Sequence, residues 1–154
     1  FNASVIAPNT IRTIEGGLLS YQSDFGREHN PYTIGLDRLV DVDQDIDFIG
    51  KEALKKIKED GISEKLVGVE IDGDPIQKAP ENFWPVFDVN SNKIGRLSRC
   101  FYSPRLKKNI GLAIIDMKYT EPGTSLVIES PKAHLNAQVH KLPWFPAEKS
   151  TNLD

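Results

Sequence analysis

The sequence predicts an α+β chain in which a part with helices precedes a small antiparallel β-barrel or sandwich. Two stretches before residue 61 carry apolar residues at helical spacing, whereas from residue 65 onward short apolar runs alternate with turn clusters. The chain has 154 residues, of which 39% are hydrophobic, so it is long enough to bury a core.

The first predicted helix covers residues 9–20. Its apolar positions recur at intervals of three and four residues, at Ile11, Ile14 and Leu18. Asn9 or Thr10 is the expected N-cap. Two glycines interrupt the pattern directly after a carboxylate, in Glu15-Gly16-Gly17, and each costs a helix interior roughly 0.8–1 kcal/mol relative to alanine. Either the glycines allow close packing of the helix, or they leave room for something else to approach.

A strand and a second helix are predicted next. Residues 35–42 resemble a strand, after Asn30-Pro31 interrupts helical structure. Residues 51–60 predict a helix, because Ala53, Leu54 and Ile57 share one face and Gly61 follows as a stop signal.

Six short strands are predicted after a boundary near residues 61–64. Each is an apolar run between clusters rich in Pro, Gly, Asn, Asp and Ser. The expected strands are residues 66–71, 85–88, 93–98, 110–115, 125–129 and 135–140. Their number and even spacing indicate a barrel or a sandwich.

Composition excludes several classes of protein. The net charge of −3 argues against general nucleic-acid binding, and the lone Cys100 excludes an internal disulfide. We therefore expect a cytoplasmic protein with neither nucleic acid nor a membrane among its partners, since no apolar run reaches about 18 residues. The chain starts at Phe1 without an initiator methionine, so we expect it to begin inside a longer protein.

Two groups of residues are spaced approximately as in metal-binding sites. Acidic residues at 41, 43, 45 and 47, with Glu52, approach the spacing of a calcium loop, but Ile46 stands where the sharp turn needs glycine. An exposed acidic edge explains the same residues. His134 and His140 share strand parity, yet three histidines without a cysteine cluster make a poor metal site. We expect no metal.

A local basic patch has two interpretations. It consists of Arg96, Arg99, Arg105, Lys107 and Lys108. It is either a solvated strand edge and turn, or a binding site for the carboxylates of a ligand tail.

Three segments resemble the aminomethyltransferase (glycine-cleavage T-protein) family. Residues 12–18 read RTIEGGL, with Tyr21 and Asp24 after them, and are similar to the family pattern R-x-E-x-G-L…Y…D. NPYTIGL and DFIGKEAL, at residues 30–36 and 47–54, resemble NPxEAGL and DFIGREAL. GRLSRCFYSPRLKKNIG and a later PGT resemble the barrel motif GxxTSGxYSPxLKKxIA…PGT.

The resemblance covers the C-terminal half of the family. It implies a ferredoxin-like α/β segment in residues 1–62, which forms the C-terminal part of the folate-binding domains. It also implies a jelly-roll-like antiparallel β-barrel in residues 63–154. This sequence departs from the motifs at Thr33, where the family usually has glutamate, and at Arg99-Cys100, where it has Ser-Gly.

The implied activity is that of a tetrahydrofolate-dependent methyltransferase. The nearest branch of the family demethylates dimethylsulfoniopropionate to methylthiopropionate and forms 5-methyltetrahydrofolate. The acidic segment at residues 41–47 stands where T-proteins carry the Lys/Arg cluster that holds the folate carboxylates, which weakens the case for a T-protein and is compatible with a divergent methyltransferase. The alternatives are a T-protein, the folate domain of a dimethylglycine or sarcosine dehydrogenase, or a non-catalytic folate-binding module.

The resemblance assigns the folate contacts to two residues of this chain. Glu15 is expected to accept paired hydrogen bonds from the pteridine edge, and Tyr21 to stack on folate or donate its hydroxyl. No catalytic residue is expected here, because the family's aspartate lies upstream. The implied partners are folate, a small-molecule methyl donor and the upstream half of the same protein, so the isolated chain is expected to be inactive.

Overall fold

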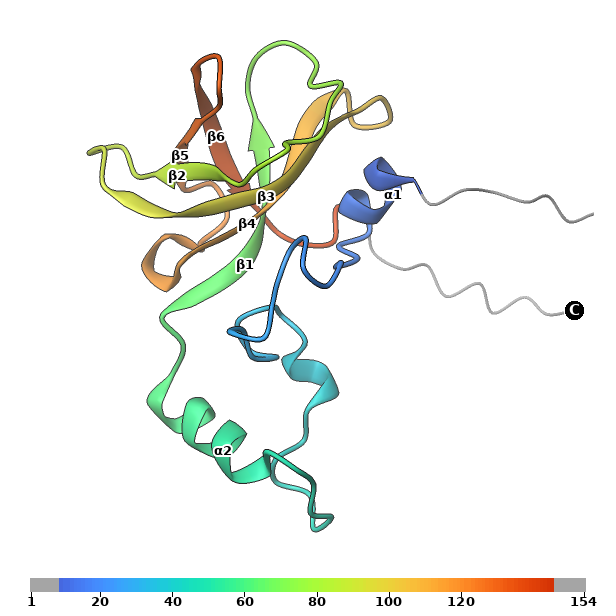
Figure 1. Cartoon of the computed structure of the whole chain (residues 1–154), viewed down its shortest axis with the longest axis vertical. Helices are drawn as coiled ribbons and strands as arrows, with labels where there is room; N and C mark the ends of the chain where they lie inside the picture. The colour runs from blue at the N-terminus through green and yellow to red at the C-terminus, as the bar shows by residue number, and fades with distance from the viewer. Residues whose placement is uncertain (1–8, 146–154) are drawn as a thin grey trace, which may run out of the picture.

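The computed structural model describes residues 9–145 and has two parts (Figure 1). A closed six-stranded barrel is preceded by a stretch of helices and turns, and the helix α2 lies at the far end of the molecule from the barrel. The helical elements are α1 (Thr10–Glu15), η1 (Asp37–Leu39), α2 (Lys51–Asp60) and η2 (Met117–Tyr119). None of the helices in these residues is long and apolar enough to cross a membrane.

The helix α1 starts where it was predicted but ends earlier. Asn9 is the N-cap, and its Oδ1 accepts from the amides of Ile11 at 2.9 Å and Arg12 at 3.3 Å. The prediction that the helix continues to residue 20 is wrong. Gly16 is the C-cap, and Gly17 has φ +65°, a left-handed conformation that glycine adopts without steric cost and that turns the chain away.

Residues 35–60 contain one wrong and one confirmed prediction. The strand expected at 35–42 is wrong, because Gly35 turns the chain at φ +71° and the short 3₁₀ helix η1 follows. The helix at 51–60 is confirmed as α2, which follows Gly50 at φ +91° and ends at Gly61 at φ +81°. None of its residues is buried against the described part of the chain.

The antiparallel barrel is confirmed, with all six predicted strands. They are β1 (Glu64–Ile71), β2 (Trp84–Phe87), β3 (Lys93–Ser103), β4 (Lys108–Asp116), β5 (Ser125–Glu129) and β6 (His134–His140). Neighbours around the barrel follow the order β1-β4-β3-β2-β5-β6, and every pair is antiparallel. Because β1 lies beside β4 rather than β2, the connectivity is of the Greek-key type that jelly rolls use.

The strand β4 is apolar on both faces because each face meets a different core. Its inward residues, such as Ala113 and Ile115, belong to the barrel interior. Its outward residues pack with Ile14 of α1 and with Trp144, which follows β6. The outward set is Ile110, Leu112 and Ile114. This second core attaches α1 to the outside of the barrel.

The strand β3 contains a β-bulge at Ser98. Leu97 pairs with Ala113 and Arg99 pairs with Leu112, so Ser98 has no partner residue on β4. Leu97 and Cys100 both belong to the barrel interior although they are three residues apart. The bulge therefore places two consecutive side chains, those of Ser98 and Arg99, on the outer face.

We expect Cys100 to be inert in the folded protein. Burial raises the pKa of its thiol to about 12, and the thiolate is the reactive form. Iodoacetamide at pH 8 should leave the Cys100 peptide unmodified in the native protein and alkylate it fully in guanidinium, as mass spectrometry of the digest would show. Rapid alkylation of the native protein at Cys100 would contradict the described core.

Candidate functional site

A cavity of about 480 Å³ lies between α1 and the turn that follows β3. α1 and its flanking residues form one wall, and the turn after Ser103 together with the chain beyond β6 forms the other. The lining residues are Asn9, Ile11, Arg12, Glu15, Gly16, Pro104, Arg105 and Phe145. The cavity thus joins residues from both ends of the described chain.

The Glu15 carboxylate is held in place by the end of β3. Glu15 is only 7% exposed, and its Oε1 accepts a hydrogen bond from the buried Ser103 hydroxyl at 2.6 Å. The Ser103 oxygen in turn accepts from the amide of Leu106 at 3.1 Å, which leaves the hydroxyl proton for Glu15. The backbone carbonyl of Glu15 accepts from the Trp144 amide at 3.0 Å. Side chain and backbone of Glu15 are therefore both fixed.

The second oxygen of the Glu15 carboxylate retains its capacity to accept hydrogen bonds. Within residues 9–145 no hydrogen bond to Oε2 is formed, whereas an ionised carboxylate offers about four lone-pair sites. Gly16 continues this wall without a side chain. The arrangement can receive a ligand edge that presents two adjacent N–H donors.

The opposite wall carries an aromatic ring and a guanidinium group. Arg105 lies over the ring of the half-buried Phe145, with its Cζ 3.5 Å from the ring centroid. Such a cation–π contact orders both side chains. Arg105 thus places positive charge across the cavity from Glu15, while Arg12 lines the cavity from α1, on the same wall as Glu15. The two guanidinium groups suit a ligand with an anionic tail.

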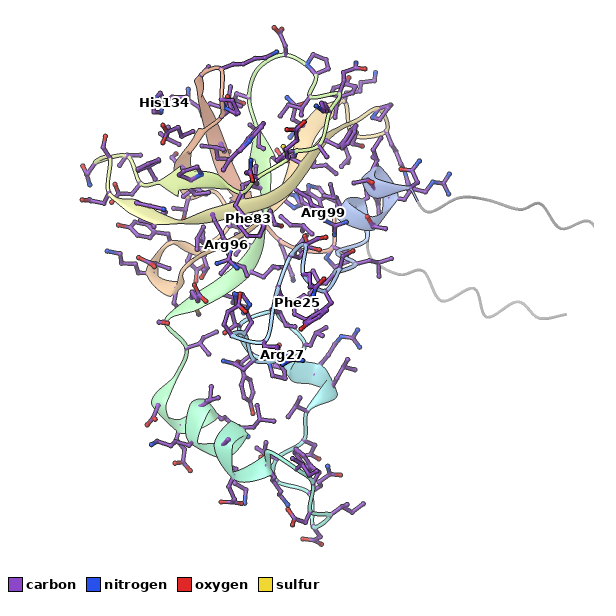
Figure 2. The ribbon with its side chains drawn as sticks, viewed as in Figure 1. Phe25, Arg27, Phe83, Arg96, Arg99 and His134 are labelled. Atoms are coloured by element: carbon purple, nitrogen blue, oxygen red, sulfur yellow. The ribbon has the colours of Figure 1, made fainter. Side chains whose placement is uncertain are left out.

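Tyr21, the second predicted site residue, does not line this cavity. It is 53% exposed, and its ring packs edge-on against Phe25, with the ring centroids 5.7 Å apart. Figure 2 shows Phe25 on the loop that runs below the barrel, away from the β5–β6 end where His134 lies. The structure therefore brings Glu15, but not Tyr21, to the cavity.

The predicted basic patch does not form one surface. Arg99 pairs with Asp24, Lys108 pairs with Glu70, and Arg96 lies near Glu28 and over the ring of Phe83. Figure 2 shows Arg96 beside Phe83 and Arg99 nearer to α1. Of the five residues only Arg105 lines this cavity.

No metal centre is found among the described residues. Across 9–145, no three or more His, Cys, Asp or Glu side chains gather as a metal would require. In the acidic segment, Asp43 instead pairs with Lys58 of α2 at 2.7 Å, and this ion pair lowers the pKa of the Asp43 carboxyl. His140 stacks on Trp144 with an interplanar angle of 4°.

Sequence reasoning missed two residues of the site, Ser103 and Phe145, and named Arg105 only as one member of the basic patch. Ser103 and Arg105 stand in the YSPR segment of the barrel motif, so the motif already contained the signal. No sequence motif pointed to Phe145. It lines the cavity because the chain that follows β6 runs back toward α1.

Comparison with known proteins identifies the family. Residues 64–146 match the family described as Glycine cleavage T-protein C-terminal barrel domain. This chain belongs to that family. The match begins at the first residue of β1 and includes all six strands of the barrel.

Relatives extend the similarity through the helical part. An aminomethyltransferase of Bacillus cytotoxicus is 37% identical over 144 residues, and one of Geobacillus sp. is 38% identical over the same length. Both matches cover 93% of this chain but 38% of the relative. The chain thus spans well under half the length of these curated relatives.

A solved structure shows the same fold. The glycine cleavage system aminomethyltransferase T from Bartonella henselae superimposes with a TM-score of 0.75 at 21% identity. The superposition covers 86% of this chain and 36% of that one. It therefore includes more of this chain than the barrel alone.

Ser103→Ala should destabilise the protein by about 1–3 kcal/mol, because it leaves Glu15 Oε1 and the Leu106 amide without partners. Chemical denaturation of the complete protein would measure this change. The matched control is Ser125→Ala, at an exposed position on β5, where a change within about 0.5 kcal/mol is expected. Equal effects of the two substitutions would show that Ser103 does not hold the carboxylate.

Proposed function

We propose that this chain is the C-terminal portion of a tetrahydrofolate-dependent one-carbon transferase, in which Glu15 binds the pteridine edge of folate. The observation that supports this proposal is a nearly buried carboxylate on a residue that lines a cavity, fixed through one oxygen by Ser103 and with acceptor capacity left on the other. In this proposal residues 1–62 belong to the folate-binding α/β domains and residues 63–154 to the barrel domain.

The cavity residues fit a pteridine ring. The ring presents N3–H and a 2-amino group side by side, and one carboxylate can accept from both. The volume of about 480 Å³ lies within the usual range of ligand pockets. Gly16 lines the cavity without a side chain, and Phe145 with Arg105 supplies an ordered wall.

The residues of this chain bind and orient rather than react. Tetrahydrofolate, when bound, supplies the nitrogen that accepts the one-carbon unit. Glu15 would fix the rotation of the ring, Ser103 would fix Glu15, and the Phe145–Arg105 wall would limit the access of water. Alignment of this kind contributes by holding the reactants in the geometry of reaction. The donor and the catalytic aspartate would be held by another part of the protein.

Two donors are candidates, each with its own support. The relatives are named aminomethyltransferases, which supports an aminomethyl carrier as the donor. The acidic segment, in which Asp43 pairs with Lys58, differs from the basic cluster that T-proteins place there for the folate tail; this difference weakens the case for a T-protein and is compatible with the sulfonium compound dimethylsulfoniopropionate as donor. Transfer from the sulfonium would break its S–CH₃ bond, form an N–CH₃ bond on folate and release a neutral thioether and a proton.

Glu15→Gln should weaken the binding of 5-formyltetrahydrofolate to the complete protein by about tenfold or more, because an amide cannot accept from both ring donors. Isothermal titration would measure the affinity. Binding of the methyl or aminomethyl donor should change less. The matched control is Glu129→Gln, at an exposed position on β5. Unchanged folate affinity in Glu15→Gln would refute the assignment.

The donor is identified by two assays on the complete protein. Transfer to tetrahydrofolate is measured with dimethylsulfoniopropionate and, separately, with the lipoyl-bound aminomethyl carrier. Turnover with one donor and not the other selects between the two proposals. A protein that binds folate but transfers from neither would support the alternative of a non-catalytic folate-binding module.

A further inference from the structure

We infer that Arg99 is a positioning residue for Glu15, and this inference rests on the proposed folate site. Arg99 does not line the cavity. Its guanidinium nevertheless joins three parts of the chain around Glu15, and it projects from the strand whose last residue bonds to the Glu15 carboxylate.

The contacts of Arg99 lie on both sides of Glu15 in the sequence. Nη1 donates to Thr13 Oγ1 at 3.2 Å, two residues before Glu15. Nη2 donates to the carbonyl of Leu18 at 2.9 Å, three residues after it and just beyond the left-handed turn at Gly17. The Arg99 side chain thus holds both the last turn of α1 and the residue that follows the turn at Gly17.

Asp24 holds the guanidinium in this orientation. Arg99 Nε donates to Oδ1 at 2.8 Å and Nη2 to Oδ2 at 2.6 Å, the paired geometry in which arginine and carboxylate bind most directionally. Asp24 is buried and also accepts from the Ser98 hydroxyl at 2.8 Å and from the Ser20 amide at 2.7 Å. With four donors around one carboxylate, the arginine has little freedom to move.

The bulge at Ser98 is what makes this arrangement possible. It places Ser98 and Arg99 together on the outer face, so both reach Asp24. From Arg99 onward the outer face alternates regularly, and Ser103 meets Glu15. Arg99 and Ser103 therefore hold the same short segment from two points of one rigid strand.

The role differs from that of Arg96, the nearest arginine on β3. Arg96 contacts His29 at 3.2 Å and Glu28 at 3.6 Å, and lies over Phe83, but makes no hydrogen bond or ion pair with residues 9–18. Substitution of Arg96 is thus a control for the loss of a positive charge from the strand.

The test compares folate affinities in the complete protein, with 5-formyltetrahydrofolate as the probe. Arg99→Gln should weaken binding about tenfold, because the segments on both sides of Glu15 lose one of the contacts that hold them on β3. Arg99→Lys, which keeps the charge beside Asp24 but not the fork of donors, should recover part of the loss. Arg96→Gln should change the affinity by less than about twofold.

A double-mutant cycle separates positioning from a general structural effect. If Arg99 acts through Glu15, Arg99→Gln should change the affinity by less than about twofold once Glu15→Gln is present. An equal loss in both backgrounds, or wild-type affinity in Arg99→Gln, would overturn the inference. Should Arg99→Gln fail to fold, Arg99→Lys decides by the same comparison. A failure of Glu15→Gln itself to weaken binding would instead refute the proposed function.

Discussion

The packing of α1 on the outside of the barrel is the interaction on which the site depends. A helix of six residues has no stability of its own in water, because nucleation costs more than so few hydrogen bonds return. Ile14, which is fully buried among the outward residues of β4, supplies about 1.5–3 kcal/mol of hydrophobic stabilisation. Glu15 follows directly, and its place beside Ser103 is a consequence of where Ile14 packs.

Polar contacts then fix the position of α1 on the barrel, which hydrophobic burial alone does not determine. An apolar contact tolerates sliding and rotation, whereas the paired hydrogen bonds of Asp24 with Arg99 and the single bond of Ser103 with Glu15 each require one geometry. A buried ion pair adds little net stability, since desolvation offsets much of the attraction. Its effect here is to select one position of residues 13–24 on the strand.

Local pattern predicted the elements whose stability is local or periodic. The six strands followed from apolar runs between turn clusters, and α2 followed from its apolar face and Gly61. The strand at 35–42 failed because no neighbouring strand pairs with it in the described chain, and pairing rather than composition stabilises a strand. The end of α1 was misplaced because helical spacing was given more weight than two consecutive glycines.

The candidate site was only half predictable for a related reason. Glu15 was identified through a motif, but Ser103, which bonds to its carboxylate, lies 88 residues further along the chain. The sequence also did not show that the residues of the predicted basic patch have different ionic partners. Neighbouring arginines in a sequence look equivalent until the opposing carboxylates, Asp24 for Arg99 and Glu28 for Arg96, are placed by the fold.

The bulge at Ser98 also bears on how such a site can arise. A strand one residue shorter here would still direct Leu97 and Cys100 inward, so the barrel does not need the extra residue. Ser98 has no partner residue on β4, so its side chain is available for contacts on the outer face of the barrel. A single inserted codon can thus give a closed barrel a second outward-facing group, while every inward side chain and the hydrogen-bonded neighbours on both sides keep their places.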